Sequence, residues 1–299
     1  MARGESEVIR VIRDRAGLAA LGPCSGETAV VMTMGALHEG HASLIRAARE
    51  RAGSNGRVVT TVFVNPRQFG AGEDFDRYPR TLDDDVALAA AAGADVVFAP
   101  EVNLMYPSSG SAQVAGISVD PGPLGCELEG ASRPGHFAGV LTVVAKLLHL
   151  TSPDVALFGE KDYQQWVLVR SMVAALDFPV DVVGVPTVRE PDGLAMSSRN
   201  RYLSPEAREA AAAIPRALRS AQLLSSADAM EDSFRADIAR AAASASVPVE
   251  IDYAVVRDLE LRSPPLAGPA RMLAAVIVDG TRLLDNVEVH LGTDTECAI

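Results

Sequence analysis

The sequence is short of cysteine, of aromatic residues and of basic charge. Its 299 residues include only Cys24, Cys126 and Cys297, which are far apart and lack the spacing of a zinc site or a disulfide framework. Lys plus Arg number 27 against 39 Asp plus Glu, which gives a net charge of −12. That balance argues against a nucleic-acid binder, because neutralising phosphates needs a basic surface. A small anionic ligand is still possible, since it needs only a local basic pocket.

Long apolar runs are also missing. The longest apolar stretch, 138–150, is interrupted by Thr142, Lys146 and His149 and is too short to cross a bilayer. The charged N-terminal residues have no apolar segment behind them, so we expect no signal peptide. With 48% hydrophobic and 22% charged residues, the composition is that of a globular protein with a sizeable core. We therefore expect a soluble, cytoplasmic protein with no membrane or nucleic-acid partner.

Short apolar runs alternate with stretches of helical periodicity in the first part of the chain. Such alternation predicts βαβ units and an α/β fold with a Rossmann-like, doubly wound parallel sheet. Ligands of these sheets bind at the carboxyl ends of the strands. The expected strands are 28–32, 58–64, 94–99, 154–158 and 180–185, and the expected helices are 42–52, 82–92, 139–150 and 163–176.

The pattern changes near Pro186. Two alanine-rich helices, 205–224 and 228–244, are followed by strands near 249–257, 272–278 and 281–291. Ser204 is a suitable N-cap for the first helix, and Asp279-Gly280 is a hairpin turn signal. At roughly 150 residues per domain, we expect two domains. These are a Rossmann-like domain over 1–186 and a smaller C-terminal α+β domain over 187–299.

The segment 33–41, Thr-Met-Gly-Ala-Leu-His-Glu-Gly-His, follows an expected strand and opens an expected helix. Backbone N–H groups at a helix start attract phosphate, and Gly40 allows close backbone approach. His38 and His41 are one helical turn apart, so both imidazoles can donate to one phosphoryl group. The alternatives are two unrelated surface histidines or a metal-binding pair.

Two further segments follow strand ends. Asn65 and Gln68 are neutral polar groups suited to a small polar substrate, although Asn-Pro is turn chemistry in its own right. In the segment 158–165, Lys161 can neutralise phosphate, Asp162 can accept ribose hydroxyls, and Gln165 would face the same cleft. The alternative for that segment is a capped, solvent-facing helix start.

A fourth segment, 189–200, lies at the expected domain junction. Ser197, Ser198 and Arg199 can bind phosphates through charge-assisted hydrogen bonds, and a junction loop can also act as a lid. The alternative is a polar linker with a helix cap.

The motifs of three other protein classes are missing from the sequence. The chain has no Walker A loop and no G-x-G-x-x-G after its first strand, so neither a P-loop NTPase nor a classical NAD-binding fold is supported. Gly193 is not part of a G-x-S-x-G elbow, so an α/β-hydrolase is not supported either.

Together these segments resemble the pantothenate synthetases (pantoate–β-alanine ligases). That family belongs to the nucleotidylyltransferase superfamily and shares a histidine-motif Rossmann fold with class I aminoacyl-tRNA synthetases. The matching segments occur in order over most of the chain: 33–41, 63–74, 78–81, 127–144, 158–165, 189–204 and RLLDN at 282–286.

The resemblance implies condensation of pantoate with β-alanine, with ATP going to AMP and pyrophosphate through a pantoyl adenylate. It implies that the domain over 1–186 binds ATP and pantoate and that the smaller domain closes over the active site. It also implies magnesium near Asp84 and Asp85, and a homodimer.

The resemblance further assigns roles to single residues. It implies that His38, His41, Lys161, Ser197, Ser198 and Arg199 act on the phosphates. Gly159 and Asp162 would reach the ribose, and Val188 and Met196 would hold the adenine. Gln68, Gln165 and Met34 would hold pantoate, with Asn65 orienting the reacting groups. Met34 and Gly40 would also contact ATP.

Two positions depart from the family pattern. Met32 replaces a proline that usually precedes Thr-Met-Gly, and Leu88 replaces a frequent glutamine one turn after Asp84 and Asp85. Leu88 puts a metal role for that helix in question. Two rival functions stay open: an adenylyltransferase that leaves AMP on its product, and an impaired homologue that binds ATP or pantoate without turnover.

Overall fold

A computed structural model describes residues 9–70, 72–73, 75–107 and 116–292. The N-terminal residues 1–8 and Cys297 lie outside these ranges. The chain divides into two compact units: residues 1–160 with 168–186 form unit 1, and residues 161–167 with 187–299 form unit 2. Helix α7 (Tyr163–Ala175) contains one of the boundaries between them.

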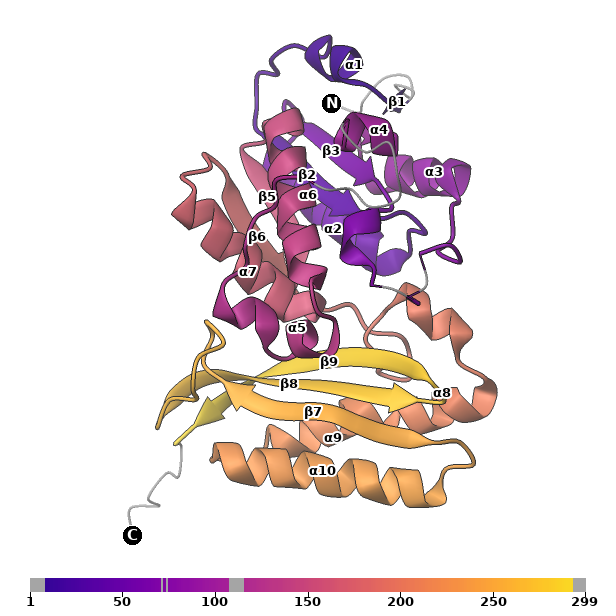
Figure 1. Cartoon of the computed structure of the whole chain (residues 1–299), viewed down its shortest axis with the longest axis vertical. Helices are drawn as coiled ribbons and strands as arrows, with labels where there is room; N and C mark the ends of the chain where they lie inside the picture. The colour runs from indigo at the N-terminus through magenta and orange to yellow at the C-terminus, as the bar shows by residue number, and fades with distance from the viewer. Residues whose placement is uncertain (1–8, 71, 74, 108–115, 293–299) are drawn as a thin grey trace. The chain divides into compact units, whose positions relative to one another are not determined.

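Unit 1 is built on a six-stranded sheet in the order β1-β4-β3-β2-β5-β6 (Figure 1), in which every neighbouring pair is parallel. The strands are β1 (Arg10–Ile12), β2 (Thr28–Thr33), β3 (Arg57–Val62), β4 (Val96–Phe98), β5 (Val155–Gly159) and β6 (Asp181–Val185). The helices before α7 are α1 (Arg15–Ala19), α2 (Glu39–Ala52), α3 (Leu82–Ala92), α4 (Val102–Met105), α5 (Glu129–Ser132) and α6 (His136–Thr151).

Successive side chains along each strand point to opposite faces of this sheet. Ala29 and Val31 of β2 pack with Ile45 of α2 and Ala89 of α3 in one buried cluster. Val30 points to the opposite face and is wholly buried, and α6 contacts β2. Burial on both faces explains why the strands are continuous apolar runs rather than alternating ones.

The strand order reverses between β2 and β5. The chain runs from β2 outward to β3 and β4, and β5 and β6 lie on the other side of β2. Such a switch point opens a crevice at the carboxyl ends of the two strands, where ligands of doubly wound sheets bind. The segment 33–41 leaves β2 at this position, and Gly159 ends β5 beside it.

Unit 2 contains an antiparallel sheet in the order β7-β8-β9, with helices α9 and α10 against one face (Figure 1). Its elements are α8 (Pro205–Ala211), α9 (Ala213–Ala221), α10 (Ala227–Ser244), β7 (Val249–Arg257), β8 (Gly268–Val278) and β9 (Thr281–Leu291). The turn between β8 and β9 has positive φ at Asp279 (48°) and Gly280 (75°), which is type I′ geometry.

The predicted parallel sheet and the predicted smaller α+β region are both confirmed. One predicted element is wrong: the helix expected over 205–224 is two helices that break at Ala212. Pro215 explains the break, because its ring clashes with the carbonyl four residues earlier, at Ala211, where α8 ends. Ser204 caps α8 as expected, accepting a hydrogen bond from the Ala207 N–H at 3.1 Å. Among the described residues, no helix is long and apolar enough to cross a membrane.

Candidate active site

His38 and His41 form a close pair at the start of α2. Their ring centroids are 4.1 Å apart. His38 Nδ1 accepts a hydrogen bond from the Gly40 N–H at 3.1 Å, and His41 Nδ1 accepts one from the His38 N–H at 3.2 Å. Because each Nδ1 is an acceptor, the neutral form of each ring carries its proton on Nε2. Both histidines therefore present an Nε2–H donor at the positive end of a helix dipole.

Asp85 of α3 anchors the loop between β2 and α2. Gly35 and Ala36 have positive φ values of 82° and 50°, which turn successive N–H groups toward one point. The carboxylate of Asp85 lies there and accepts hydrogen bonds from Ala36 N at 3.1 Å and Leu37 N at 2.7 Å. A Cβ at Gly35 would lie 2.8 Å from Asp85 Oδ2, so the loop requires glycine at this position.

The two residues expected to lie near magnesium have different surroundings: Asp85 is buried and hydrogen-bonded, and Asp84 is exposed. Asp85 is only 2% exposed, and its oxygens already accept from two backbone N–H groups and from the Thr81 hydroxyl at 3.3 Å. Asp84 is exposed on the same helix. In the part of the chain that the structure describes, no group of three or more His, Cys, Asp or Glu side chains is arranged to hold a metal ion. These contacts favour Asp85 as an anchor of the loop over Asp85 as a metal ligand.

The two departures from the family pattern have local explanations. Met32 lies within β2, in register with Thr61 of β3, so strand pairing fixes the backbone that proline would otherwise stiffen. Leu88 is partly buried and packs against the apolar cluster beneath α2 and α3. A leucine at that position therefore extends the core of unit 1.

Met34, Asn65 and Gln68 are brought into direct contact. The Gln68 side chain donates to Met34 Sδ at 2.9 Å and accepts at Oε1 from Asn65 Nδ2 at 3.1 Å. Asn65 is wholly buried, and its amide also donates to the Gly139 carbonyl at 3.1 Å. Asn65 therefore orients the Gln68 carboxamide. Gln68, in contrast to Asn65, is only partly buried.

Sequence reasoning missed the residues that support this trio. Tyr106 donates to Asn65 Oδ1 at 2.8 Å, and burial raises the pKa of Tyr106 to about 12, so the phenol keeps its proton. His136 Nδ1 donates to the Gln68 carbonyl at 2.8 Å. Burial, aided by the nearby Arg133 guanidinium, lowers the pKa of His136 to about 4. Tyr106 lies in none of the segments that the resemblance rests on, so no local signal marks it. His136 lies in the matching segment 127–144, to which no single-residue role was assigned.

Arg133 completes this support. Its guanidinium pairs with Glu73 at 2.6 Å and contacts His136 Nε2 at 3.1 Å. The pair with Arg133 lowers the pKa of Glu73 below its usual value of 4.5. Because an arginine can only donate, His136 Nε2 is the acceptor and Nδ1 carries the proton. The histidine is therefore a fixed neutral donor to the backbone of Gln68.

Gly159 ends β5 with open space at its α-carbon, since a Cβ built there meets no protein atom within 4 Å. Lys161 and Asp162 follow in a short 3₁₀ helix, and their side chains pair at 3.0 Å. Gln165 lies two residues into α7 and is partly exposed. Protein packing thus leaves room beside Gly159 for a ligand to approach the backbone.

The segment 188–199 is a tight hairpin in unit 2. Arg189 and Ala195 form a β-bridge, and the Met196 N–H donates to the Val188 carbonyl at 2.9 Å. Ser197 then caps a short 3₁₀ helix (Ser198–Tyr202), accepting from the Arg199 N–H at 3.3 Å. Val188 and Met196 are therefore adjacent, and Ser197, Ser198 and Arg199 share one turn.

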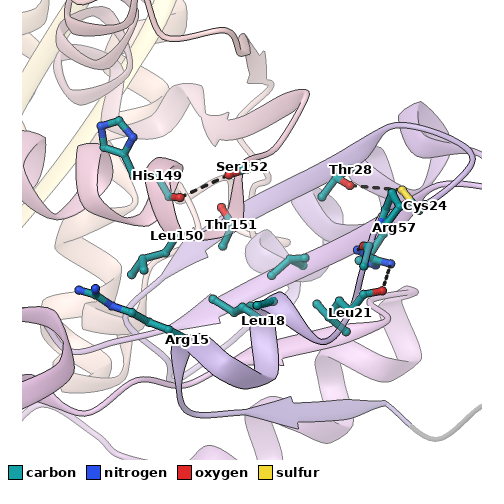
Figure 2. Close-up of a pocket in the computed structure, with 14 residues that line it drawn as sticks. Arg15, Leu18, Leu21, Cys24, Thr28, Arg57, His149, Leu150, Thr151 and Ser152 are labelled. Atoms are coloured by element: carbon teal, nitrogen blue, oxygen red, sulfur yellow. Dashed lines mark hydrogen bonds between the residues drawn. The ribbon is translucent and has the colours of Figure 1, made fainter.

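A separate cavity of about 400 Å³ lies in unit 1 (Figure 2). Thr28 and Arg57, the first residues of β2 and β3, line it together with Cys24 and His149. Arg57 donates to the carbonyls of Leu21 and Gly22, so its guanidinium is committed to the protein. None of the predicted site residues lines this cavity, and it is at the amino ends of the strands rather than the carboxyl ends.

Comparisons with known proteins agree with this geometry. The sequence model of the pantoate-beta-alanine ligase family matches residues 8–288. The chain is 55% identical over 282 residues to the pantothenate synthetase of Salinispora arenicola (strain CNS-205), covering 94% of this chain and 98% of that protein. It is 52% identical over 292 residues to that of Mycobacterium sp. (strain KMS), covering 97% and 90%.

A crystal structure of pantothenate synthetase from Thermus thermophilus superimposes with a TM-score of 0.83 at 45% identity, covering 93% of this chain and 99% of that one. A pantoate-beta-alanine ligase from Francisella tularensis, complexed with beta-gamma ATP and β-alanine, superimposes with a TM-score of 0.75 at 30% identity. It covers 93% of this chain and 97% of the Francisella chain. The chain therefore belongs to the family of pantoate–β-alanine ligases, which use ATP to condense pantoate with β-alanine.

Proposed function

We propose that this chain condenses pantoate with β-alanine in two steps. A carboxylate oxygen of pantoate attacks the α-phosphorus of ATP, which forms pantoyl adenylate and releases pyrophosphate. The β-alanine amine then attacks the activated carbonyl and expels AMP. The first step converts a carboxylate, which is a poor acyl donor, into one with a good leaving group. No covalent enzyme intermediate is needed.

The single observation that carries this proposal is the imidazole pair of His38 and His41. Both rings are oriented by backbone N–H groups so that Nε2 donates. The transition state of adenylyl transfer spreads negative charge over phosphate oxygens, and preorganised donors at that charge lower the barrier. The pair also follows β2 at the switch point of the sheet, where ligands of doubly wound folds bind.

The other ATP contacts follow from the residue types. Lys161 and Arg199 supply cationic donors to phosphate oxygens, and the hydroxyls of Ser197 and Ser198 add neutral ones. Gly40 and Gly159 allow the nucleotide to approach the backbone, and Asp162 accepts ribose hydroxyls. Val188 and Met196, which are paired through their backbones, provide an apolar edge for the adenine.

Pantoate is held by Gln68 in this proposal. Met34 and Asn65 fix the Gln68 carboxamide from two sides, so its remaining hydrogen-bonding capacity is directed at the substrate. Gln165 is proposed as the second carboxamide on pantoate. Asn65 acts through Gln68, because its own amide is engaged by Tyr106 and by the Gly139 carbonyl.

Magnesium is proposed to enter as part of the MgATP substrate rather than as an ion bound by Asp84 and Asp85. Four further expectations from the sequence stay predictions. These are the division into domains 1–186 and 187–299, the closure of the smaller domain over the active site, the homodimer and the cytoplasmic location.

The deciding experiment is exchange of labelled pyrophosphate into ATP, with magnesium and without β-alanine. Exchange that requires pantoate supports reversible formation of an acyl adenylate, and added β-alanine should then release AMP and pantothenate. An adenylyltransferase would instead leave AMP on its product. Absence of exchange from a folded protein that binds ATP would contradict the proposal and favour an impaired homologue.

A further inference from the structure

Asp285 and Asn286, the last two residues of the segment RLLDN, are polar and yet each is only 4% exposed. Neither has a role in the reaction proposed above. They are consecutive on β9, where Asp285 pairs with Ala274 and Asn286 with Leu273 of β8. Because side chains alternate along a strand, the two residues point to opposite faces of the sheet.

Asn286 holds the backbone of Lys161. Its Nδ2 donates to the Lys161 carbonyl at 2.9 Å, and its Oδ1 accepts from Arg271 Nε at 2.7 Å. Since arginine can only donate, Arg271 fixes which end of the amide faces Lys161. The Arg271 guanidinium in turn lies 4.4 Å from the ring centroid of Tyr163, two residues after Lys161. Asn286 and Arg271 therefore contact the 161–163 segment at two points, the Lys161 carbonyl and the Tyr163 ring.

Asp285 holds the hairpin that carries Ser197. Both of its oxygens accept from the Arg189 guanidinium, at 2.7 and 2.9 Å, in the planar bidentate geometry that best fixes orientation. Arg189 also donates to the Gly193 carbonyl at 3.1 Å, which closes the hairpin. Asp285 and Ser197 line one small cavity of about 10 Å³. Asp285 therefore lies close to Ser197, the first residue of the 197–199 turn.

We propose that Asp285 and Asn286 are positioning residues that set the spacing between the two ATP-binding segments of unit 2. One strand supplies both anchors, so the spacing between Lys161 and the 197–199 turn is fixed by a hydrogen-bonded sheet rather than by two loops. The inference rests on the proposed contacts of these segments with ATP. A misplacement of about 1 Å in such a site can cost about 100-fold in rate, which gives the pair a kinetic role without any contact to substrate.

The test measures pantoate-dependent pyrophosphate exchange and the overall reaction in two variants at Asn286. Asn286→Ala removes the donor to Lys161, and Asn286→Asp removes it while keeping an acceptor for Arg271. We expect both to raise the KM for ATP about tenfold or more and to slow exchange, with the KM for β-alanine within about twofold of wild type. Asp285→Asn should give the same signature through the 197–199 turn.

The matched control is Asp252→Asn, which breaks an ion pair with Arg282 in the same sheet and should leave both KM values unchanged. Thermal unfolding of each variant separates a kinetic effect from a loss of fold, and Asn286→Asp, which is isosteric, serves if Asn286→Ala does not fold. A uniform loss that follows the folded fraction, with the KM for ATP unchanged, would overturn the proposal.

A double variant separates this proposal from the proposed function. If Asn286 acts through Lys161, then Lys161→Ala with Asn286→Ala should be no worse than Lys161→Ala alone. Loss of exchange in Lys161→Ala with normal exchange in both Asn286 variants would refute the positioning role and leave the function standing. Normal exchange in Lys161→Ala would refute the ATP contact itself, and the positioning role with it.

Discussion

The carboxylate of Asp85 accepts a hydrogen bond from the backbone N–H of Leu37 at 2.7 Å. The two residues are far apart in the sequence, and the contact joins α3 to the loop that leads into α2. An anion beneath the turn of Gly35 and Ala36 stabilises their positive φ values. The start of α2, and with it His38, is thereby fixed before any nucleotide binds.

Asp85→Asn should therefore damage the loop. An amide keeps the size of the side chain but replaces one acceptor oxygen with a donor that faces a backbone N–H. Leaving a buried N–H unsatisfied costs about 1–3 kcal/mol, and the KM for ATP should rise as the loop loosens. Chemical unfolding and pyrophosphate exchange measure the two effects.

Asp84→Asn is the control for that experiment. Asp84 is exposed on the same helix, and its variant should match wild type in stability and in the magnesium concentration needed for half-maximal activity. A change in that magnesium requirement in either variant would favour a metal role for this helix instead.

Periodicity predicted the helices and strands well, because the pattern of apolar residues along the chain follows which side chains are buried. The core of β2, Ala29 to Val31, is apolar at every position since both faces of the sheet are covered, and helix α3 was predicted with its observed bounds. The short strand β1 was missed, because three residues carry no detectable period. The break at Ala212 was missed because alanine propensity hid the effect of Pro215.

The site was predictable only where local chemistry marks it. His38 and His41 share one turn, and their spacing alone predicts that they converge. Tyr106 contacts Asn65 over 41 positions, and Asp285 contacts Arg189 over 96. Such partners are chosen by tertiary packing, so no window along the chain reveals them. The contact of Asp85 with the loop was not foreseen for the same reason, since it depends on how α3 packs.

His38→Asn should abolish most of the exchange activity while keeping the fold. Asparagine is a strong N-cap residue and can accept from the Gly40 N–H as His38 Nδ1 does. It lacks the Nε2 donor, and loss of one donor to a developing anion costs about 100-fold or more in kcat. Single-turnover formation of the adenylate and thermal unfolding measure the two properties. Near wild-type turnover in folded His38→Asn would remove the basis of the proposed mechanism.

Gly159→Val should weaken ATP binding without harming stability. A Cβ at this position meets no protein atom within 4 Å, and a β-branched residue suits the end of a strand. We expect the KM for ATP to rise about tenfold with little change in the melting temperature. Gly56→Val is the contrasting variant: a Cβ there would lie 2.3 Å from the Ala52 carbonyl oxygen, so it should destabilise the fold. Unchanged ATP kinetics in Gly159→Val would argue against a nucleotide at β5.

Stability should fall as the pH drops from about 6.5 to 4. The pKa of His136 is lowered from 6.5 to about 4 by burial, so between these values the unfolded chain binds a proton that the folded protein excludes. The stabilisation is present above the unfolded pKa and is lost as the pH falls toward the folded one, by about 3 kcal/mol for an isolated site. Glu73, whose pKa is lowered, adds a loss below 4.5.

His136→Gln tests the assignment of that slope. Glutamine can donate to the Gln68 carbonyl and accept from Arg133, and it does not titrate. Urea unfolding at a series of pH values should give a flatter dependence between 6.5 and 4 for the variant than for wild type. An equally steep slope in the variant would assign the loss to other groups.

Gln68→Ala should raise the KM for pantoate at least about tenfold while the KM for ATP stays within about twofold, because the carboxamide is proposed to bind only the acid substrate. If Asn65 acts through Gln68, as their 3.1 Å hydrogen bond indicates, then Asn65→Ala should also weaken pantoate binding and raise the KM for pantoate. It should destabilise the fold as well, since Tyr106 and the Gly139 carbonyl lose their partner. In the double variant the pantoate KM should equal that of Gln68→Ala, because a residue that works through another adds nothing once the other is gone. Additive losses would instead place Asn65 in direct contact with pantoate.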